Sequence, residues 1–230
     1  MRVFRGRAAS IAADRDVSRR LLSIAADGEP AVRVWTPHRQ VAFGRRDARL
    51  EGYERARVAA TERGFPPIER DVGGRAVAYD GATTLAFARA EPVTDGRTGT
   101  TARYERTTAA LEQALRTLGL EPNRGEPADS FCPGTHSLSI DAHAGERKVV
   151  GIAQRVRSEA ALVAGIVLVA DRGDLSDVLE AVYGALGVAL APASVGSIAA
   201  AGGPAEPEPV RAAVEDALVG DATTVSIESL

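Results

Sequence analysis

The stretch GERKVVGIAQR, residues 145–155, decides how the middle of the chain folds. It includes the end of a turn-like HAGE segment and lies between two other strand-like runs, HSLSIDA at 136–142 and ALVAGIVLVA at 161–170. Short apolar runs separated by turn residues are typical of neighbouring strands. The three runs therefore predict a strand meander. Lys148, inside the first stretch, is the only lysine among the 28 Lys and Arg residues of the chain.

Helical and strand-like patterns alternate on both sides of this meander. Apolar residues recur at helical spacing in residues 13–28, 50–64, 102–120, 174–187 and 210–220. Strand-like runs occupy 31–36 and 40–44 around a turn, and residues 68–90 are interpreted as a hairpin with a Gly pair before it. A small-residue linker at 199–209 precedes the last helix. Helices and strands together predict an α+β chain that buries its own core.

Composition excludes several classes of function. The net charge is -3 and 26% of residues are charged, so no basic field is available for nucleic acid. A single Cys cannot form an intrachain disulfide, and charges interrupt the N-terminal residues where a secretory signal would be apolar. The longest apolar run is shorter than the roughly 18 residues of a membrane helix. We therefore expect a cytoplasmic protein with no nucleic-acid or membrane partner.

The glycine pair in RDVGGRAV, Gly73 and Gly74, is the first candidate for chemistry. Glycines allow positive φ and let backbone N–H groups approach a ligand. Arg70 and Arg75 flank the pair and could clamp an anion. An ordinary glycine turn is the alternative interpretation.

Cys132 and Lys148 are the other two candidates. Cys132 lies in the loop sequence SFCPGTHS, where a nearby cation would make it a nucleophile, whereas the alternative is a small buried residue. Lys148 is either a solvated strand cation or a compact donor that reaches a carbonyl or phosphate. The histidines, His38, His136 and His143, show no metal-ligand spacing with one another or with Cys132. We expect no metal site.

These stretches together resemble the lipoate-protein ligase A and octanoyltransferase family of the biotin/lipoate protein ligases. The family's glycine motif, Arg-x-x-Gly-Gly-(Gly/Arg)-Ala-Val-x-His, is similar to Arg70–Tyr79, and its Arg form resembles the Cys-dependent octanoyltransferase branch. The lysine motif, Lys-(Ile/Val)-x-Gly-x-(Ala/Gly)-Gln, is matched by Lys148–Gln154. Gly44 and Arg45 resemble an early Gly-Arg corner of the family, and Cys132 resembles the acyl-accepting thiol of the transferases.

The resemblance implies a fold and a set of site residues. It implies a mixed, largely antiparallel central sheet flanked by helices, with a catalytic domain at 1–194. Residues 195–230 are then a linker and a helix that pack on the same domain, without an accessory domain. Cys132 and Lys148 are the implied catalytic residues. The implied substrate-binding residues are Arg45, Arg70, Gly73, Gly74, Arg75, Ala76, Tyr79, Gly151 and Gly165.

Two enzymatic versions follow from the resemblance. In the transferase version, Cys132 takes an octanoyl or lipoyl group as a thioester, and Lys148 lowers the pKa of the thiol and polarises the acyl carbonyl. In the ligase version, ATP with Mg²⁺ activates lipoate, Arg70 and the glycine amides hold the phosphate, and Lys148 bridges phosphate and carbonyl. No tightly bound cofactor is expected in either. A catalytically silent lipoyl-domain-binding paralogue is the third possibility.

The resemblance also implies partners. The expected acceptors are lipoyl domains of 2-oxo acid dehydrogenase acyltransferase subunits or the glycine cleavage H protein, with acyl carrier protein as one possible donor and a separate accessory subunit as a possible partner. Three departures from the family pattern affect the head-group site: Val72 replaces Ser/Thr, Tyr79 replaces His, and Ala164 replaces the His of a His-Gly motif. Each removes a polar contact that the family's pattern would supply.

Overall fold

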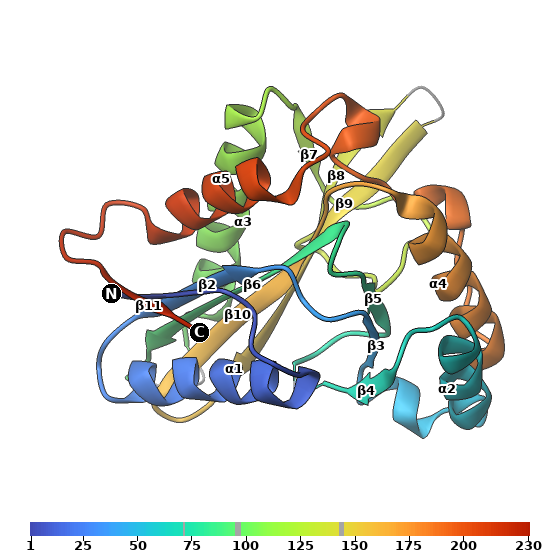
Figure 1. The fold of residues 1–230 in the computed structure, drawn as a ribbon, viewed down its shortest axis with the longest axis horizontal. Coiled ribbons are helices and arrows are strands. Elements are labelled where there is room, and N and C mark those ends of the chain that lie inside the picture. The colour runs from blue at the N-terminus through green and yellow to red at the C-terminus, as the bar shows by residue number, and fades with distance from the viewer. Residues whose placement is uncertain (71, 95–97, 143–144) are drawn as a thin grey trace.

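An eight-stranded sheet crosses the molecule in the computed structural model, which describes residues 1–70, 72–94, 98–142 and 145–230 (Figure 1). Its order is β11 (Ser226–Ser229), β1 (Arg2–Arg5), β2 (Ala31–Trp35), β6 (Thr84–Pro92), β10 (Ala160–Leu168), β9 (Gly145–Val156), β8 (Leu138–Ala142) and β7 (Pro122–Arg124). Neighbours are antiparallel except β11, β1 and β2, which run parallel. The predicted α+β class, the largely antiparallel sheet and the meander are confirmed.

A second, three-stranded sheet carries the glycine motif. Its order is β4 (Pro67–Glu69), β3 (Gln40–Phe43) and β5 (Val77–Tyr79). The hairpin predicted within residues 68–90 is therefore wrong, because β5 pairs with β3 whereas β6 pairs with β2 and β10. Residues 80–83 carry the chain from one sheet to the other. A Cβ on Gly81 would lie 2.4 Å from the Pro37 carbonyl oxygen, so this crossing requires glycine.

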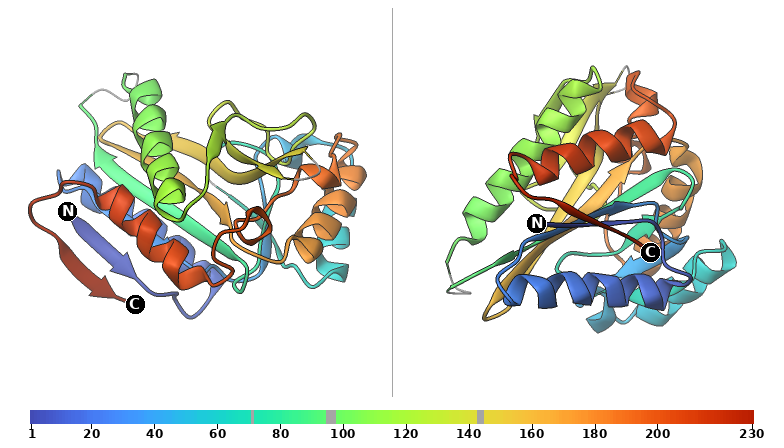
Figure 2. Two further views of the ribbon diagram at one scale, coloured as in Figure 1. Left: turned by 90° about the horizontal axis from the view of Figure 1, so that it is seen from above. Right: turned by 60° about the vertical axis from the view of Figure 1, so that its left-hand side comes forward.

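Five helices cover the two sheets: α1 (Ile11–Ala26), α2 (Tyr53–Glu62), α3 (Thr100–Thr117), α4 (Arg172–Leu186) and α5 (Pro207–Val219). Helices α3 and α5 lie on one face of the large sheet and α1 lies on the other (Figure 2). Helices α2 and α4 pack together beside the small sheet. Single-turn 3₁₀ helices occupy Asp47–Arg49, Pro192–Ser194 and Ala199–Ala201. The apolar stripes that predicted these helices thus face three separate core clusters.

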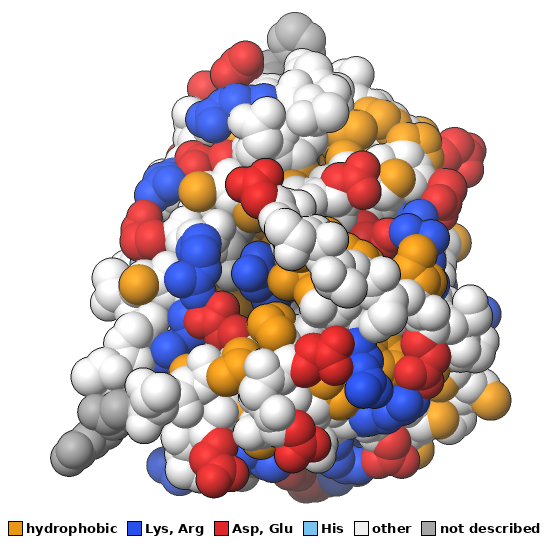
Figure 3. Space-filling model, turned by 90° about the vertical axis from the view of Figure 1, so that its left-hand side faces the viewer, with side chains coloured by type: hydrophobic (Ala, Val, Ile, Leu, Met, Phe, Trp, Pro, Cys, Tyr) orange, Lys and Arg blue, Asp and Glu red, His pale blue; other side chains and the backbone are white. Residues whose placement is uncertain are grey.

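The ends of the described chain meet at one edge of the large sheet. Strand β11 pairs with β1, and α5 packs against α3 and β2. Neither four-residue strand was predicted, because RVFR and SIES are too short to show a period. Basic and acidic side chains are interspersed on the face of the molecule that Figure 3 shows. Within the described residues, no helix combines the length and apolarity that crossing a bilayer demands.

Candidate active site

Cys132 lies in a loop whose backbone is held in an unusual conformation. Its φ is +43°, a left-handed value that is uncommon for a residue with a Cβ. The Cys132 N–H donates to the Tyr183 hydroxyl at 2.6 Å, and that hydroxyl donates to the Ala76 carbonyl at 3.0 Å. Tyr183 comes from α4 and Ala76 directly precedes β5. The loop is therefore attached to both α4 and the small sheet, and this attachment fixes the direction of the thiol.

Two donors from the glycine motif point at the Cys132 sulfur. Arg70 Nη2 lies 3.0 Å from Sγ, and the backbone N–H of Arg75 lies 3.3 Å from it. Arg70 Nη2 also donates to the Arg75 carbonyl at 2.6 Å. Burial lowers the pKa of Arg70, but the facing Cys132 and Tyr79 raise it by more, so the guanidinium stays charged. A cation and an amide that donate to one sulfur stabilise negative charge on it.

The glycines of the motif leave space for these donors. Gly74 has φ +98°, and a Cβ there would lie 2.4 Å from Arg70 Nη2 and 2.5 Å from Cys132 Sγ. Gly44, at the end of β3, faces it: a Cβ on Gly44 would lie 1.8 Å from the Gly74 carbonyl oxygen. Gly73, by contrast, has open space where its Cβ would be. Close approach around the thiol therefore requires Gly44 and Gly74 but not Gly73.

Lys148 lies on the other side of the Cys132 backbone and is fully buried. Its Nζ donates to Glu126 Oε2 at 2.6 Å, to the Phe131 carbonyl at 2.8 Å and to the Cys132 carbonyl at 2.9 Å. Burial lowers the pKa of Lys148, although Cys132 and Glu126 oppose this effect. Three acceptors around one nitrogen need three N–H groups, which only the ammonium has. We therefore assign Lys148 as charged, on geometry rather than on burial.

Glu126 connects Lys148 to the rest of the Cys132 loop. Its Oε1 accepts from the Gly134 N–H at 2.7 Å, and its Oε2 accepts from the Ser137 hydroxyl at 2.7 Å. The carboxylate thus contacts the loop two and five residues after the thiol. Lys148 and Glu126 together hold both arms of the loop that carries Cys132.

The early Gly-Arg corner contributes a different residue from the one predicted. Arg45 is exposed there, and within the described chain it forms no hydrogen bond or ion pair. Asp47, two residues later, is fully buried and accepts from the Gly44 N–H at 2.9 Å and from Arg75 Nη1 at 3.2 Å. Asp47 therefore fixes the side chain of Arg75 while the Arg75 backbone faces the thiol.

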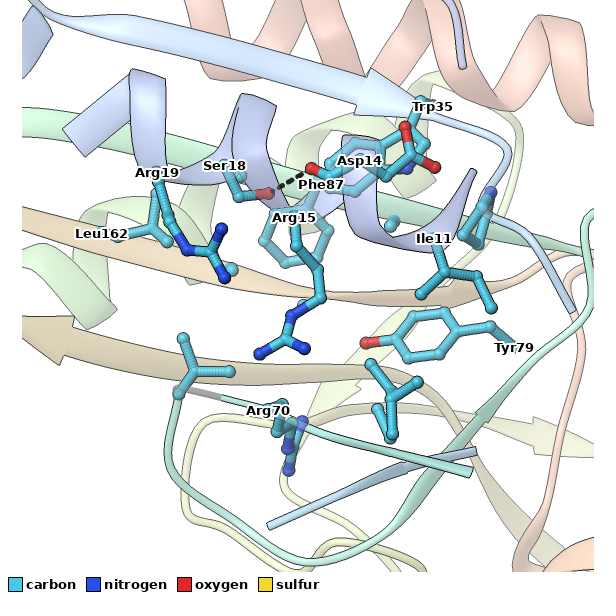
Figure 4. A pocket seen from close by; sticks show the side chains of 18 of the residues that line it. Ile11, Asp14, Arg15, Ser18, Arg19, Trp35, Arg70, Tyr79, Phe87 and Leu162 are labelled. Carbon is cyan, nitrogen blue, oxygen red and sulfur yellow. Dashed lines mark hydrogen bonds between the residues drawn. The ribbon is translucent and has the colours of Figure 1, made fainter. Parts of the chain in front are cut away.

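A pocket of about 150 Å³ opens beside this site, between α1 and the large sheet. Ala86, Ala88 and Ala164 line its floor, and their small methyl side chains leave space below α1. Figure 4 shows Arg15 and Arg19 of α1 reaching over the pocket and the Tyr79 hydroxyl directed into it. Burial raises the pKa of Tyr79 although Arg70 opposes this, so the phenol stays neutral.

A second, narrow cavity lies beside this pocket, at the thiol. Cys132, Gly151 and Ala153 line it, and it shares Arg70, Tyr79 and Gly165 with the larger pocket. A Cβ on Gly165 would lie 2.1 Å from the Gly151 carbonyl and 2.4 Å from Phe87 Cζ, so the two strands approach closely there. The structure thus brings together around Cys132 all the site residues predicted from the sequence except Arg45 and Gly73.

Sequence reasoning missed three supporting residues. Glu126 lies in a polar loop without a recognisable motif, and Tyr183 fits the apolar stripe of α4. Asp47 followed two more conspicuous arginines. Arg70, which the ligase version would place on a phosphate, contacts the thiol in this structure, and Lys148 contacts the Cys132 carbonyl. His143 lies outside the described residues.

The chain matches the family model described as lipoyl protein ligase A/B catalytic domain over residues 11–219. A curated relative, the octanoyl-[GcvH]:protein N-octanoyltransferase of Exiguobacterium sibiricum, is 34% identical over 134 residues, which are 58% of this chain and 46% of the relative. The chain therefore matches about half the length of that relative.

Solved structures share the fold. A lipoate-protein ligase A bound with ATP has a TM-score of 0.71 at 21% identity, with 100% of this chain and 88% of that chain covered. A bi-partite lipoate protein ligase from Thermoplasma acidophilum, studied with its E2 lipoyl domain, has a TM-score of 0.65 at 20% identity and covers 100% and 86%. The match to the family model over most of the chain places this protein in the lipoyl protein ligase A/B catalytic domain family.

Proposed function

We propose that this chain transfers an octanoyl group between lysine side chains of lipoyl-type domains through a thioester on Cys132. The single observation that carries the proposal is the environment of the sulfur. Arg70 Nη2 at 3.0 Å and the Arg75 N–H at 3.3 Å both donate to Sγ. A sulfur held by two donors in this way is positioned to act as the nucleophile towards an acyl carbonyl.

The reaction has two symmetric halves. The thiolate attacks the carbonyl of an octanoyl-lysine donor, the donor amine leaves, and a second lysine then attacks the thioester. Oxygen carries negative charge in both tetrahedral intermediates, and donors around the sulfur are placed to stabilise such charge. The glycine loop brings these donors to the sulfur because Gly74 lacks the Cβ that would collide with Arg70 and Cys132.

The pocket below α1 suits the acyl chain. Its lining combines apolar residues from α1 with the alanine floor of β6 and β10, and it shares Arg70, Tyr79 and Gly165 with the narrow cavity at Cys132. The volume of about 150 Å³ is of the order needed for a short acyl chain. Lipoyl, which carries a ring at its end, is the second acyl group that we consider for this pocket.

The partners follow from the names of the relatives. By its name, the Exiguobacterium relative takes an octanoyl group from GcvH, and the Thermoplasma ligase is paired with an E2 lipoyl domain. We propose the glycine cleavage H protein as donor and lipoyl domains as acceptors. Acyl carrier protein and an accessory subunit stay predictions from the sequence.

The ATP-dependent version is the less favoured alternative. One neighbour binds ATP, but in this chain the Arg70 guanidinium is engaged by Cys132 and the Arg75 carbonyl. Those contacts would have to break for Arg70 to hold a phosphate.

Intact-mass analysis tests the proposal. Wild-type chain incubated with octanoyl-H protein and no acceptor should gain one octanoyl group that maps to Cys132 and disappears when an apo lipoyl domain is added. Cys132→Ser should form no adduct and transfer nothing. Full ligation by Cys132→Ser with lipoate, ATP and Mg²⁺ would overturn the transferase and favour the ligase.

A further inference from the structure

Three alanines lie side by side across neighbouring strands of the large sheet, on the face that α1 covers. The register of β10 places Ala164 opposite Ala88 of β6 on one side and opposite Ala153 of β9 on the other. Ala88 and Ala164 line the pocket below α1, and Ala153 lines the narrow cavity at the thiol. Because neighbouring strands are about 4.8 Å apart, this alanine row crosses a distance of about 10 Å.

Larger side chains border the alanine row on β10. Leu162 and Ile166 lie two residues before and two residues after Ala164, so the three side chains point to the same face of the sheet. Leu162 lines the pocket and Ile166 lines the cavity. Ala164 is only partly buried, although it lies in the middle of a strand that is paired on both sides. The alanine row is therefore the floor of a groove that runs across the strands.

The groove begins beside Cys132. The large-sheet residues that line the cavity at the thiol come from β9 and β10, whereas those that line the pocket include Ala88 of β6 and Trp35 of β2. Gly165 of β10 lines both spaces. The sheet order β9, β10, β6 and β2 is thus also the order of increasing distance from the thiol.

A fixed group of side chains stands at the far end of the alanine row. Arg33 of β2 lies opposite Ala88 and is fully buried. Its Nη2 donates to Asp14 Oδ1 of α1 at 2.6 Å, and its guanidinium carbon lies 4.2 Å from the centroid of the Trp35 ring. A buried ion pair resists displacement, because separating it leaves a buried charge uncompensated. Arg33 and Trp35 therefore form a firm end wall.

We propose that the alanine row selects the length of the acyl chain. This rests on the thioester route proposed above, in which the acyl carbonyl is bonded to Cys132. The chain crosses Ala153, Ala164 and Ala88 in that order, and its end approaches Trp35. Each CH₂ group that the groove removes from water should raise kcat/KM by about fourfold, until the chain meets the end wall. The departure from the family's His at position 164 leaves the row open.

Substitutions along the row should shorten the accepted chain in the order of distance from the thiol. Acetyl-, hexanoyl- and octanoyl-N-acetylcysteamine serve as donors, and intact mass follows thioester formation at Cys132. Ala88→Leu should lower the octanoyl-to-hexanoyl rate ratio by about 10–200-fold, the range for one group too many in an apolar pocket. Ala164→Leu should lower the hexanoyl-to-acetyl ratio as well. These ratios do not change when a variant merely contains less folded protein.

Trp35 is the only tryptophan of the chain, so its fluorescence reports on the far end of the groove in the wild type. Free octanoate, without ATP, should change the emission in a saturable manner, hexanoate should change it less, and acetate should leave it unchanged. In Ala88→Leu the response to octanoate should disappear. This measurement needs neither the thioester nor any substitution in its first arm.

Two results would overturn the proposal: wild-type rate ratios in both alanine variants, or equal responses of Trp35 to octanoate and acetate. A wild type that forms no thioester with any donor, yet responds to octanoate, would reject the thioester route and retain the groove. Normal thioester formation with unchanged ratios would reject the groove and retain the route. The failure of the proposed function and the failure of this inference are thereby distinguished.

Discussion

Arg70 and Lys148 both contact Cys132, but they contact different atoms and come from different sheets. Arg70 follows β4 of the small sheet and donates to the sulfur, whereas Lys148 lies on β9 of the large sheet and donates to the carbonyl oxygen. Arg70 lines both the pocket below α1 and the narrow cavity at the thiol, whereas Lys148 is fully buried among three acceptors. The difference teaches that one cation faces the sulfur, whereas the other holds the loop that presents it.

Removing the partner of the buried cation should have the largest effect. In Glu126→Ala, Lys148 would be a buried ammonium without its carboxylate, and the Gly134 and Ser137 contacts would be lost too. We expect the free energy of unfolding to fall by about 3–5 kcal/mol, the cost of breaking a buried ion pair. Chemical denaturation measures it. Glu121→Ala, at an exposed position, is the control, and equal stability of the two variants would contradict the structural role of Lys148.

Removing the Arg70 cation, which contacts the sulfur, should lower the reaction rate more than the stability. For Arg70→Met we expect thioester formation to slow by about 10²–10³, the range for losing one donor to a developing charge. The free energy of unfolding should fall by only about 1–3 kcal/mol, the net contribution of its two hydrogen bonds. Mass-resolved time courses and denaturation on the same sample check both. An unchanged rate would mean that the contact with Sγ is incidental.

The Tyr183 hydroxyl, which joins the Cys132 loop to Ala76, should have a smaller effect. Tyr183→Phe leaves the Cys132 N–H and the Ala76 carbonyl without their partner. We expect a loss of roughly 1–3 kcal/mol in unfolding free energy, typical of buried groups left unsatisfied. Chemical denaturation of this variant at a single pH measures the loss. An unchanged free energy of unfolding would argue that solvent reaches both groups.

The adjacent glycines provide the smallest and most closely matched comparison. Gly74→Ala places a Cβ against Arg70 and Cys132 in a left-handed backbone, so we expect thioester formation to slow by about tenfold and stability to fall by about 1–2 kcal/mol. Gly73→Ala meets open space and should change neither. Similar rates in the two variants would contradict the role assigned to Gly74.

The sequence predicts the elements better than their connections. Long periodic segments such as α3 and the β8–β10 meander follow from local pattern, because one period covers many residues. The β5 and β6 strands are also locally visible, yet their assignment to separate sheets depends on close packing of Gly81 against Pro37. β1 and β11 lack any period, since four residues are too few.

For the site, the residues that bear the motifs were predictable and their contacts were not. Cys132 and Arg70 are 62 residues apart, and Tyr183 and Ala76 are 107 apart, so no local rule joins them. The resemblance to the family identified Lys148, but its three acceptors come from a loop with no regular pattern. The motif singled out the residue, whereas its contacts depend on the fold.

Lys148→Arg tests most directly why this chain keeps its only lysine. Glu126 Oε2 and the carbonyls of Phe131 and Cys132 converge on one buried point, which suits a compact ammonium and not a planar guanidinium. We expect the free energy of unfolding to fall by about 1–3 kcal/mol, as for an overpacked core, and octanoyl transfer to fall by about 10² or more. A variant within about 0.5 kcal/mol of wild-type stability, with transfer within about twofold, would contradict the role of Lys148 in holding the Cys132 loop.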